Sequence, residues 1–356
     1  MKKILLSIGA FVILVAAGAY IDHRMKMDNS LDILKNPDTP EASLAVSATP
    51  QPGKPAATPE PVTLTAIGKA PEFAGISTWL NSDPLTIASL KGKVVLIDFW
   101  TYSCINCIRT LPYVTKWYDT YKGQGFVVIG VHTPEFDFEK DTGNVQDAIK
   151  RFNIHYPVAQ DNSYGTWNAY SNQYWPAEYL IDKNGDVVYT HFGEGEYDHT
   201  ENAIREALGM TASVMPDNGT DLSGIQSPEM YFGTSRLQYL VSSQSPSDDK
   251  VYTAPSTIPL NTFAMSGEWK FTPEVAQLVG GSGTITLKFH SSKVHMVASS
   301  PIAAKLTITV DGKVQPSITV KNSELYTLFN GAAAADHIIE IKVDQPGFQA
   351  FTFTFS

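Results

Sequence analysis

The chain has 356 residues, which favours more than one domain, and 43% of them are hydrophobic, enough to fill real cores. Its net charge of −10 and pI near 5.3 argue against a nucleic-acid partner or an anionic lipid surface, since either would need a basic face. The sequence also lacks a glycine-rich loop of the kind that cradles phosphate.

The N-terminus indicates export. Lys2 and Lys3 precede an apolar run over residues 4–21, which is about the length needed to cross a bilayer. Lysines before such a run keep that end cytoplasmic, so the rest of the chain is expected outside. We expect an uncleaved anchor over residues 1–22; cleavage as a signal peptide at residues 17–19 (AGA) is the alternative, and the protein would then be secreted.

A proline-rich linker is expected over residues 23–62. Its prolines lie among alanine, threonine, serine and glutamate, at positions Pro37, Pro40, Pro50, Pro52, Pro55, Pro59 and Pro61. Such a segment buries too little apolar area to fold and favours an extended conformation, so we expect a tether.

Residues 63–211 alternate strands and helices, which predicts an α/β domain. Strands are expected at 94–99, 126–131, 178–182 and 186–191, with a short segment at 157–159. Helices are expected at 111–121, 145–152 and 201–208. The last two strands are joined by Lys183-Asn184-Gly185, a tight hairpin signal.

Residues 217–356 show short alternating stretches and few helical periods, which predicts an all-β sandwich. The expected strands are 283–290, 294–298, 305–310, 314–320, 337–343 and 348–355. Turn signals such as Asp311-Gly312 separate them.

The chain's two cysteines, Cys104 and Cys107, lie three residues apart directly after the strand expected at 94–99. A disulfide can bridge that spacing, yet as a staple it would contribute only about 2 kcal/mol. The pair is better explained as a redox-active disulfide, which is repeatedly formed and reduced. The alternatives are two buried thiols without a role, or half of a zinc site that lacks a second pair of ligands; we expect no metal.

A cysteine where a strand ends and a helix begins faces unpaired backbone N–H groups and the positive end of the helix dipole. Both favour the thiolate of Cys104. Cys107, one turn inside the helix, is expected to be more buried. We therefore expect Cys104 to attack a substrate disulfide and Cys107 to resolve the mixed disulfide.

Three further residues are candidates near this pair. Asp98 lies within an apolar strand, and a desolvated carboxyl there would have a raised pKa and accept the proton of Cys107; the alternative is a strand-end aspartate that faces water. His132 and Glu135 follow the next strand, at the same edge of a parallel sheet, where either could tune the thiols. His132 is equally consistent with a structural histidine.

Trp175-Pro176 precedes the strand expected at 178–182 and suits a cis peptide bond, although most bonds before proline are trans.

These residues resemble the thioredoxin superfamily. The strand-to-dithiol motif is VLIDFWTYSCINC at 95–107, with Asp98 and Trp100 at two of the superfamily's recurring positions. The segments APEF at 70–73 and LKGK at 90–93 resemble its exported ResA/TlpA branch. WTYSCINCIRTLPY at 100–113, GVHTPEF at 130–136 and SPEMYFG at 227–233 are similar to DipZ-type proteins, whose C-terminal domain has a carbohydrate-binding-module-like jelly roll.

The resemblance implies a thiol–disulfide oxidoreductase with Pro176 as the cis-proline facing the dithiol and the backbone of Trp175 pairing with substrate. We also expect Trp100 and His132 to be substrate-binding residues. Two departures stand out. Ser103 replaces a second tryptophan of thioredoxin, and one expected span replaces the multi-helix membrane domain of DipZ proteins. Reducing equivalents would therefore come from a separate membrane protein.

We expect a reductant of protein disulfides that acts outside the cytoplasm with no cofactor besides its own cysteine pair. Neither residue between the cysteines is charged, and strong oxidants usually stabilise their thiolate more. The alternative is a surface-anchored protein whose β-sandwich binds glycan or protein. Its sugar platform would use Tyr231, Phe232, Tyr239 and Trp269, although such aromatics are more often core residues. A shielding or positioning role for the sandwich fits equally well.

Overall fold

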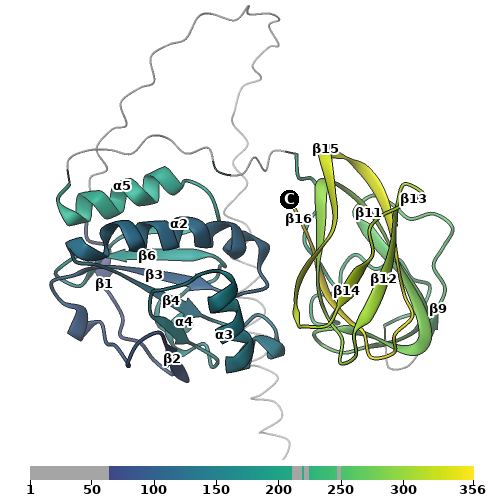
Figure 1. The fold of residues 1–356 in the computed structure, drawn as a ribbon, viewed down its shortest axis with the longest axis horizontal. Helices are drawn as coiled ribbons and strands as arrows, with labels where there is room; N and C mark the ends of the chain where they lie inside the picture. Colours follow the sequence, from purple (N-terminus) through teal and green to yellow (C-terminus); the bar gives the residue numbers. More distant parts are fainter. Residues whose placement is uncertain (1–63, 211–218, 220–223, 247–249) are drawn as a thin grey trace, which may run out of the picture. The chain divides into compact units, whose positions relative to one another are not determined.

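The computed structural model describes residues 64–210, 219, 224–246 and 250–356, which all belong to one compact unit, Thr58–Ser356 (Figure 1). The expected anchor, the proline-rich linker and most of the boundary between the two domains lie outside the described residues. Within the described ranges, no helix is both long and apolar enough to span a bilayer.

The N-terminal domain is built on a seven-stranded sheet with the strand order β1-β7-β6-β3-β4-β5-β2. Its strands are β1 (Gly68–Lys69), β2 (Thr78–Leu80), β3 (Val94–Trp100), β4 (Phe126–His132), β5 (Val158–Gln160), β6 (Ala177–Ile181) and β7 (Asp186–Phe192). The central strands β3, β4 and β5 run parallel, whereas β6 pairs antiparallel with β3 and β7. The expected α/β order of strands is confirmed.

The central strand β3 forms because its residues are apolar on both faces, and all seven are buried. Val94, Leu96 and Trp100 join one core cluster, while Val95, Ile97 and Phe99 join the other. By this alternation Asp98 shares the face of Val94, Leu96 and Trp100.

Helices cover both faces of the sheet: α2 (Ile105–Tyr121), α3 (Thr142–Arg151), α4 (Gly165–Ala169) and α5 (Tyr197–Leu208). Side chains of α2, α3 and α5 pack into the cluster that contains Leu96, and α4 packs into the cluster that contains Phe99. Figure 1 shows α2 and α5 lying over the same side of the sheet. The short 3₁₀ turns are η2 (Ala88–Leu90), η3 (Lys122–Gln124) and η4 (Asp137–Lys140).

Three helices begin earlier than their apolar pattern indicates. Helix α2 begins at Ile105 rather than at residue 111, because Cys104 caps it. Helix α3 begins at Thr142, because the Asp141 carboxylate accepts the backbone N–H of Asn144 at 3.0 Å. Helix α5 begins at Tyr197, directly after Glu196 in a left-handed conformation.

The C-terminal domain is a large antiparallel β structure. Its strands are β8 (Met230–Tyr231), β9 (Lys250–Tyr252), β10 (Thr262–Phe271), β11 (Ala276–Ser299), β12 (Ala304–Val310), β13 (Lys313–Val314), β14 (Ile318–Val320), β15 (Glu324–Val343) and β16 (Gln349–Phe355). The main path is β13-β12-β15-β11-β10-β9, with β14 paired to β12 and β16 paired to β11 and β8. The β-rich class is confirmed, and its finer description as a jelly roll stays a prediction.

Two expected strand divisions in this domain are wrong. The segments 283–290 and 294–298 form the single 24-residue strand β11, which passes through register shifts near Ser291 and Val294 instead of a turn. The segment 314–320 is divided between β13 and β14. The strand therefore continues through a bulge where the polar residues suggest an end.

A small apolar cluster joins the two domains. Phe136 comes from the N-terminal domain, and Val275, Val297 and Phe351 come from the C-terminal domain. The ring of Phe351 packs edge-on against Phe136 and Phe138, at centroid distances of 5.2 and 4.8 Å. The domains thus share buried apolar surface next to the loop after β4.

Candidate functional site

The junction between β3 and α2 places one sulfur at the start of a helix. Cys104 is the N-cap of α2 in an extended conformation, and its Sγ accepts the Cys107 backbone N–H at 3.4 Å. Cys104 is half-buried, whereas Cys107 is only 1% exposed. The expected difference in burial between the two cysteines is confirmed, and both are free thiols in this structure.

The loop before β6 faces the same sulfur. The Trp175–Pro176 peptide bond is cis, and the Trp175 carbonyl accepts the Cys104 thiol at 3.9 Å. The backbone of Trp175 therefore lies directly beside the Cys104 sulfur.

The second sulfur and Asp98 are both enclosed by protein. Burial raises the pKa of Cys107 well above its ordinary value, and nearby Cys104 and Asp98 add to the rise. Burial also raises the pKa of Asp98 to about 7, and neither carboxylate oxygen has a hydrogen-bond partner among the described residues. The expected desolvated carboxyl is confirmed, and its pKa lets it exchange protons near neutral pH.

Glu178, which the sequence analysis missed, is the direct cross-strand partner of Asp98 in the β3–β6 pair. It is 1% exposed, and burial, with the neighbouring Asp98 charge, raises its pKa to about 8. Its Oε2 accepts the Thr200 hydroxyl at 2.9 Å. The signal available was a single carboxylate inside the apolar strand 177–181 (AEYLI), the same kind of signal that identified Asp98.

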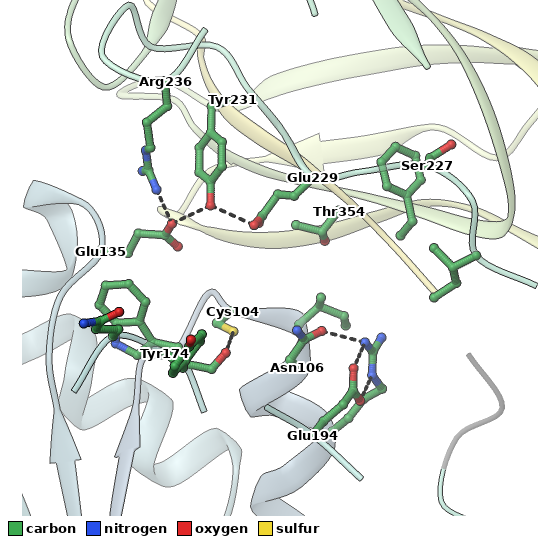
Figure 2. Close-up of a pocket in the computed structure, with 16 residues that line it drawn as sticks. Cys104, Asn106, Glu135, Tyr174, Glu194, Ser227, Glu229, Tyr231, Arg236 and Thr354 are labelled. Atoms are coloured by element: carbon green, nitrogen blue, oxygen red, sulfur yellow. Dashed lines mark hydrogen bonds and ion pairs between the residues drawn. The ribbon is translucent and has the colours of Figure 1, made fainter. Parts of the chain in front are cut away.

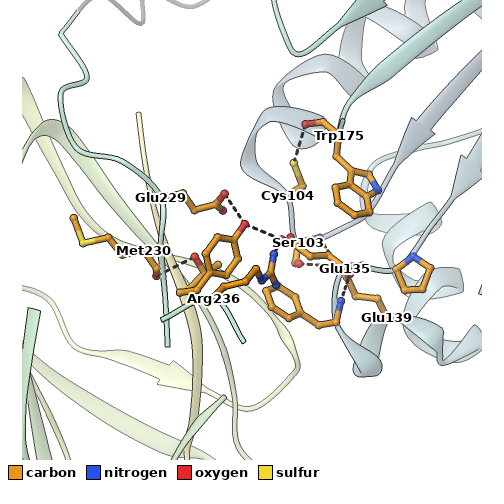
Figure 3. A network of polar contacts seen from close by, with 12 residues as sticks. Ser103, Cys104, Glu135, Glu139, Trp175, Glu229, Met230 and Arg236 are labelled. Carbon is orange, nitrogen blue, oxygen red and sulfur yellow. Dashed lines mark hydrogen bonds and ion pairs between the residues drawn. The ribbon is translucent and has the colours of Figure 1, made fainter. Parts of the chain in front are cut away.

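Glu139, also missed, fixes the loop that precedes Cys104. Its carboxylate accepts the Ser103 hydroxyl at 2.6 Å and, on the other oxygen, the backbone N–H groups of Glu135 and Phe136 at 2.6 and 3.1 Å (Figure 3). Glu139 is fully buried, and burial raises its pKa to about 7. No periodic signal reveals it, because η4 is a single short turn.

Glu135 points toward the C-terminal domain. Its carboxylate accepts the Arg236 guanidinium at 2.6 Å and the Tyr231 hydroxyl at 2.8 Å, while the Tyr231 hydroxyl also lies 2.7 Å from Glu229 (Figure 3). The Arg236 guanidinium stacks over the Tyr231 ring, 3.6 Å from its centroid. Glu135 therefore bridges the domains, and no contact between its carboxylate and either sulfur is recorded among the described residues.

The expected substrate contacts of Trp100 and His132 are wrong. Both side chains are 0% exposed, because each lies in the core beneath the loop rather than at its surface. His132 meets the edge of Trp100 and stacks on Tyr102, and burial lowers its pKa to about 3. His132 is therefore a neutral structural histidine at physiological pH.

The sugar-stacking platform considered for the C-terminal domain is not formed. Phe232 and Trp269 are 0% exposed core residues, Tyr239 packs against the same core, and Tyr231 faces the N-terminal domain. The structure confirms that Phe232 and Trp269 are core residues.

Cys104 opens into a cavity of about 490 Å³ between the two domains (Figure 2). On the floor, Arg109 forms an ion pair with Glu194 at 2.5 Å and donates to Asn106 at 2.8 Å. Residues of the C-terminal domain, among them Glu229, Tyr231, Arg236 and Thr354, line the other side. The described residues include no group of three metal-binding side chains.

A paired thiol at a helix start, a second thiol above a buried carboxyl and a cis-proline loop beside them define a redox protein of the thioredoxin class. The family model "Redoxin" matches residues 66–208, and "Thioredoxin like C-terminal domain" matches residues 227–356.

Several known proteins are similar to parts of this chain. DipZ of Mycobacterium tuberculosis is 38% identical over 82% of this chain and 43% of its own length. The thiol-disulfide oxidoreductase ResA of Bacillus cereus is 31% identical over 39% of this chain and 78% of its own length. The solved structure of a thiol:disulfide interchange protein from Chlorobium tepidum is 25% identical over 42% of this chain and 100% of its own, with a TM-score of 0.35.

The chain belongs to the thioredoxin-like thiol–disulfide oxidoreductases. It spans less than half the length of the DipZ proteins that it matches.

Proposed function

We propose that this protein is a membrane-tethered oxidoreductase that reduces protein disulfides outside the cytoplasm. The observation that carries the proposal is the position of Cys104, which caps α2 beside the Trp175 carbonyl while Cys107 lies buried one turn below. The half-buried sulfur can meet a substrate, and the buried one can meet only its partner.

The first step is attack by the Cys104 thiolate on a substrate disulfide. One sulfur–sulfur bond of the substrate breaks, a mixed disulfide with Cys104 forms, and the first substrate sulfur leaves as a thiolate. The Cys107 N–H that points at Sγ stabilises negative charge on Cys104 before the attack.

The second step needs a proton acceptor inside the protein. Cys107 transfers its proton to the Asp98 carboxylate, and the new thiolate attacks Cys104 Sγ. The Cys104–Cys107 disulfide forms and the second substrate sulfur leaves as a thiolate, so two electrons have passed to the substrate. Asp98 suits this step because its raised pKa, about 7, reduces the difference between the pKa of the carboxyl and that of the Cys107 thiol.

The remaining assignments follow from position and from the family. The Trp175 backbone pairs with the bound substrate chain, and Pro176 shapes that loop. Glu135 acts on the site only through its bridge to Tyr231 and Arg236. The chemistry uses the cysteine pair itself, with no other cofactor.

In this proposal a separate membrane protein re-reduces the oxidised Cys104–Cys107 pair. The apolar run at 4–21 anchors the protein with its folded domains outside the cytoplasm. Protease treatment of intact cells tests this placement, because the domains are digested only if they are exposed outside the cytoplasmic membrane.

The reducing direction is tested by the equilibrium potential of the Cys104–Cys107 pair. We expect a value well below about −120 mV, the potential of the strongest periplasmic oxidants. A value near that of those oxidants would reverse the direction.

A trapping experiment tests the function as a whole. In Cys107→Ala the first step proceeds and the second cannot, so Cys104 should accumulate as a mixed disulfide with its natural substrate. Cys104→Ala is the matched control and should trap nothing. Mass spectrometry of adducts isolated from the native compartment identifies the substrate; no adduct on Cys107→Ala would contradict the proposal.

A further inference from the structure

The cavity above Cys104 has two walls from two domains. Cys104, Arg109 and Trp175 line the side of the N-terminal domain, and Glu229, Tyr231 and Arg236 line the other (Figure 2). A substrate that reaches the Cys104 sulfur must therefore fit between the domains.

The second wall is held in place at several points. Glu135 accepts both Arg236 and Tyr231, and its side chain is only 10% exposed. The apolar contact of Phe351 with Phe136 lies one residue further along the same loop. The wall is thus part of the folded unit and not a loosely placed neighbour.

The volume of the cavity limits the substrate. About 490 Å³ falls in the range of sites that enclose small ligands, roughly 300–1,000 Å³. A folded partner that docks by its surface typically covers about 800 Å² and contributes roughly 20–30 residues. Such a surface cannot approach a sulfur at the base of a two-walled cavity of this size.

Groups on the floor favour a peptide backbone. The Trp175 carbonyl lies 3.9 Å from Cys104 Sγ and can accept an N–H. Arg109 is held by Glu194 and Asn106, and its remaining nitrogen Nη1 is buried, so the Trp175 carbonyl is the backbone-pairing group at this sulfur. An extended peptide offers an N–H donor at each residue, which suits this carbonyl.

We propose that the C-terminal domain forms half of the substrate site and that this site selects disulfides carried by short, extended peptide segments over disulfides on folded surfaces. The inference rests on the proposed function and names its substrate class. It gives the C-terminal domain a direct role in specificity.

The test compares kcat/KM of the full chain for three disulfides. They are a linear peptide with a cystine link, bis(2-hydroxyethyl) disulfide, which lacks a backbone, and a compact folded protein with one disulfide at its surface. We expect the peptide to exceed each of the others by at least about tenfold. Equal values for peptide and folded protein would overturn the inference while leaving the proposed function intact. Equal values for peptide and bis(2-hydroxyethyl) disulfide would overturn the role of the backbone.

Variants of the second wall sharpen the test. Tyr231→Ala and Arg236→Ala remove wall atoms, so the preference for peptide over folded protein should fall by about fivefold or more. Val314→Ala is the control, because Val314 is 77% exposed on β13 of the same domain and lines no part of the cavity. If Tyr231→Ala does not fold by circular dichroism, Tyr231→Phe keeps the ring and loses only the hydroxyl group, with its bonds to Glu135 and Glu229. An unchanged preference in every folded wall variant contradicts the inference. A wild-type chain that reduces none of the three disulfides contradicts the proposed function itself.

Discussion

The place of Asp98 in strand β3 buries its carboxyl group, and no hydrogen bond among the described residues offsets the loss of water around it. Its raised pKa means that the folded protein holds the Asp98 proton more tightly than the unfolded chain does. The favourable contribution of Asp98 to stability is therefore complete below pH 3.8, the unfolded value, and is lost as the pH rises through about 7.

Asp98→Asn should consequently stabilise the protein at alkaline pH. The gain in unfolding free energy should grow between pH 4 and 7 and then level off, with an upper limit of about 4 kcal/mol from the pKa difference. Urea unfolding at a series of pH values measures it. Asp83→Asn, at an exposed loop position, is the control and should show no such trend. A gain that is constant with pH would show that Asp98 ionises in the folded protein as it does in the unfolded chain.

The same substitution should slow catalysis. Without a carboxylate, Cys107 loses its proton acceptor, so resolution of the mixed disulfide should slow by about 100-fold at pH 7. Single-turnover release of substrate thiol measures this step. Wild-type resolution should accelerate as the pH rises through about 7, and this acceleration should be absent from Asp98→Asn.

At the scale of elements, the loop between β3 and α2 depends on η4. Glu139 accepts Ser103 and the backbone N–H groups of Glu135 and Phe136, so one side chain connects the dithiol loop to the segment that meets the C-terminal domain. A carboxylate is required there, because both of its oxygens act as acceptors.

Glu139→Gln should therefore destabilise the protein at pH 7. The amide nitrogen cannot accept, so either the Ser103 N–H on one side or the Glu135 and Phe136 N–H groups on the other lose their acceptor, at a cost of about 1–3 kcal/mol. Denaturant midpoints measure the loss, and the rate of Cys104 alkylation reports whether the loop has loosened. Glu268→Gln, on the exposed side of β10, should change neither. If both variants alkylate at the wild-type rate, Glu139 does not hold the loop.

The sequence predicts elements whose buried residues recur with a regular period. It misses residues whose position depends on one contact in the folded structure. Strand β3 and Asp98 are predictable because a lone carboxylate in a fully apolar run has no solvent to face. Glu178 carries the same signal on β6 and could have been found by the same reasoning. Glu139 could not, since only the folded loop brings it to Ser103.

Tryptophan and histidine at positions 100 and 132 show a related limit. Both residues lie at the end of their strands next to the dithiol loop, where Trp100 pairs with His132, but their side chains are buried in the core. The bulged β11 shows the converse, because polar residues at 290–293 interrupt the alternation without ending the strand.

At the scale of the molecule, the two domains meet through one apolar cluster and several ionic contacts. Phe351 packs on Phe136 and Phe138, and Arg151 of α3 pairs with Glu324 of β15. The apolar cluster should contribute much of the free energy of this contact, because a partly exposed ion pair such as Arg151–Glu324 is typically weak.

Phe351→Ala should weaken the contact and separate the unfolding of the domains. Loss of a buried aromatic ring costs about 3–5 kcal/mol. Calorimetry should therefore resolve two unfolding transitions that lie further apart than those of the wild type. Val314→Ala, far from this cluster on the exposed face of β13, should unfold like the wild type. A single unchanged transition in Phe351→Ala would show that the two domains are not coupled through this ring.

The long strand β11 pairs with β10, β15 and β16, so three ladders of the C-terminal domain share it. A protease cut within it would remove a shared neighbour from three ladders together, and neither fragment would keep a complete hydrophobic interior. We expect insertions to be tolerated at the turns of this domain, such as the one at Asp311-Gly312, rather than within β11.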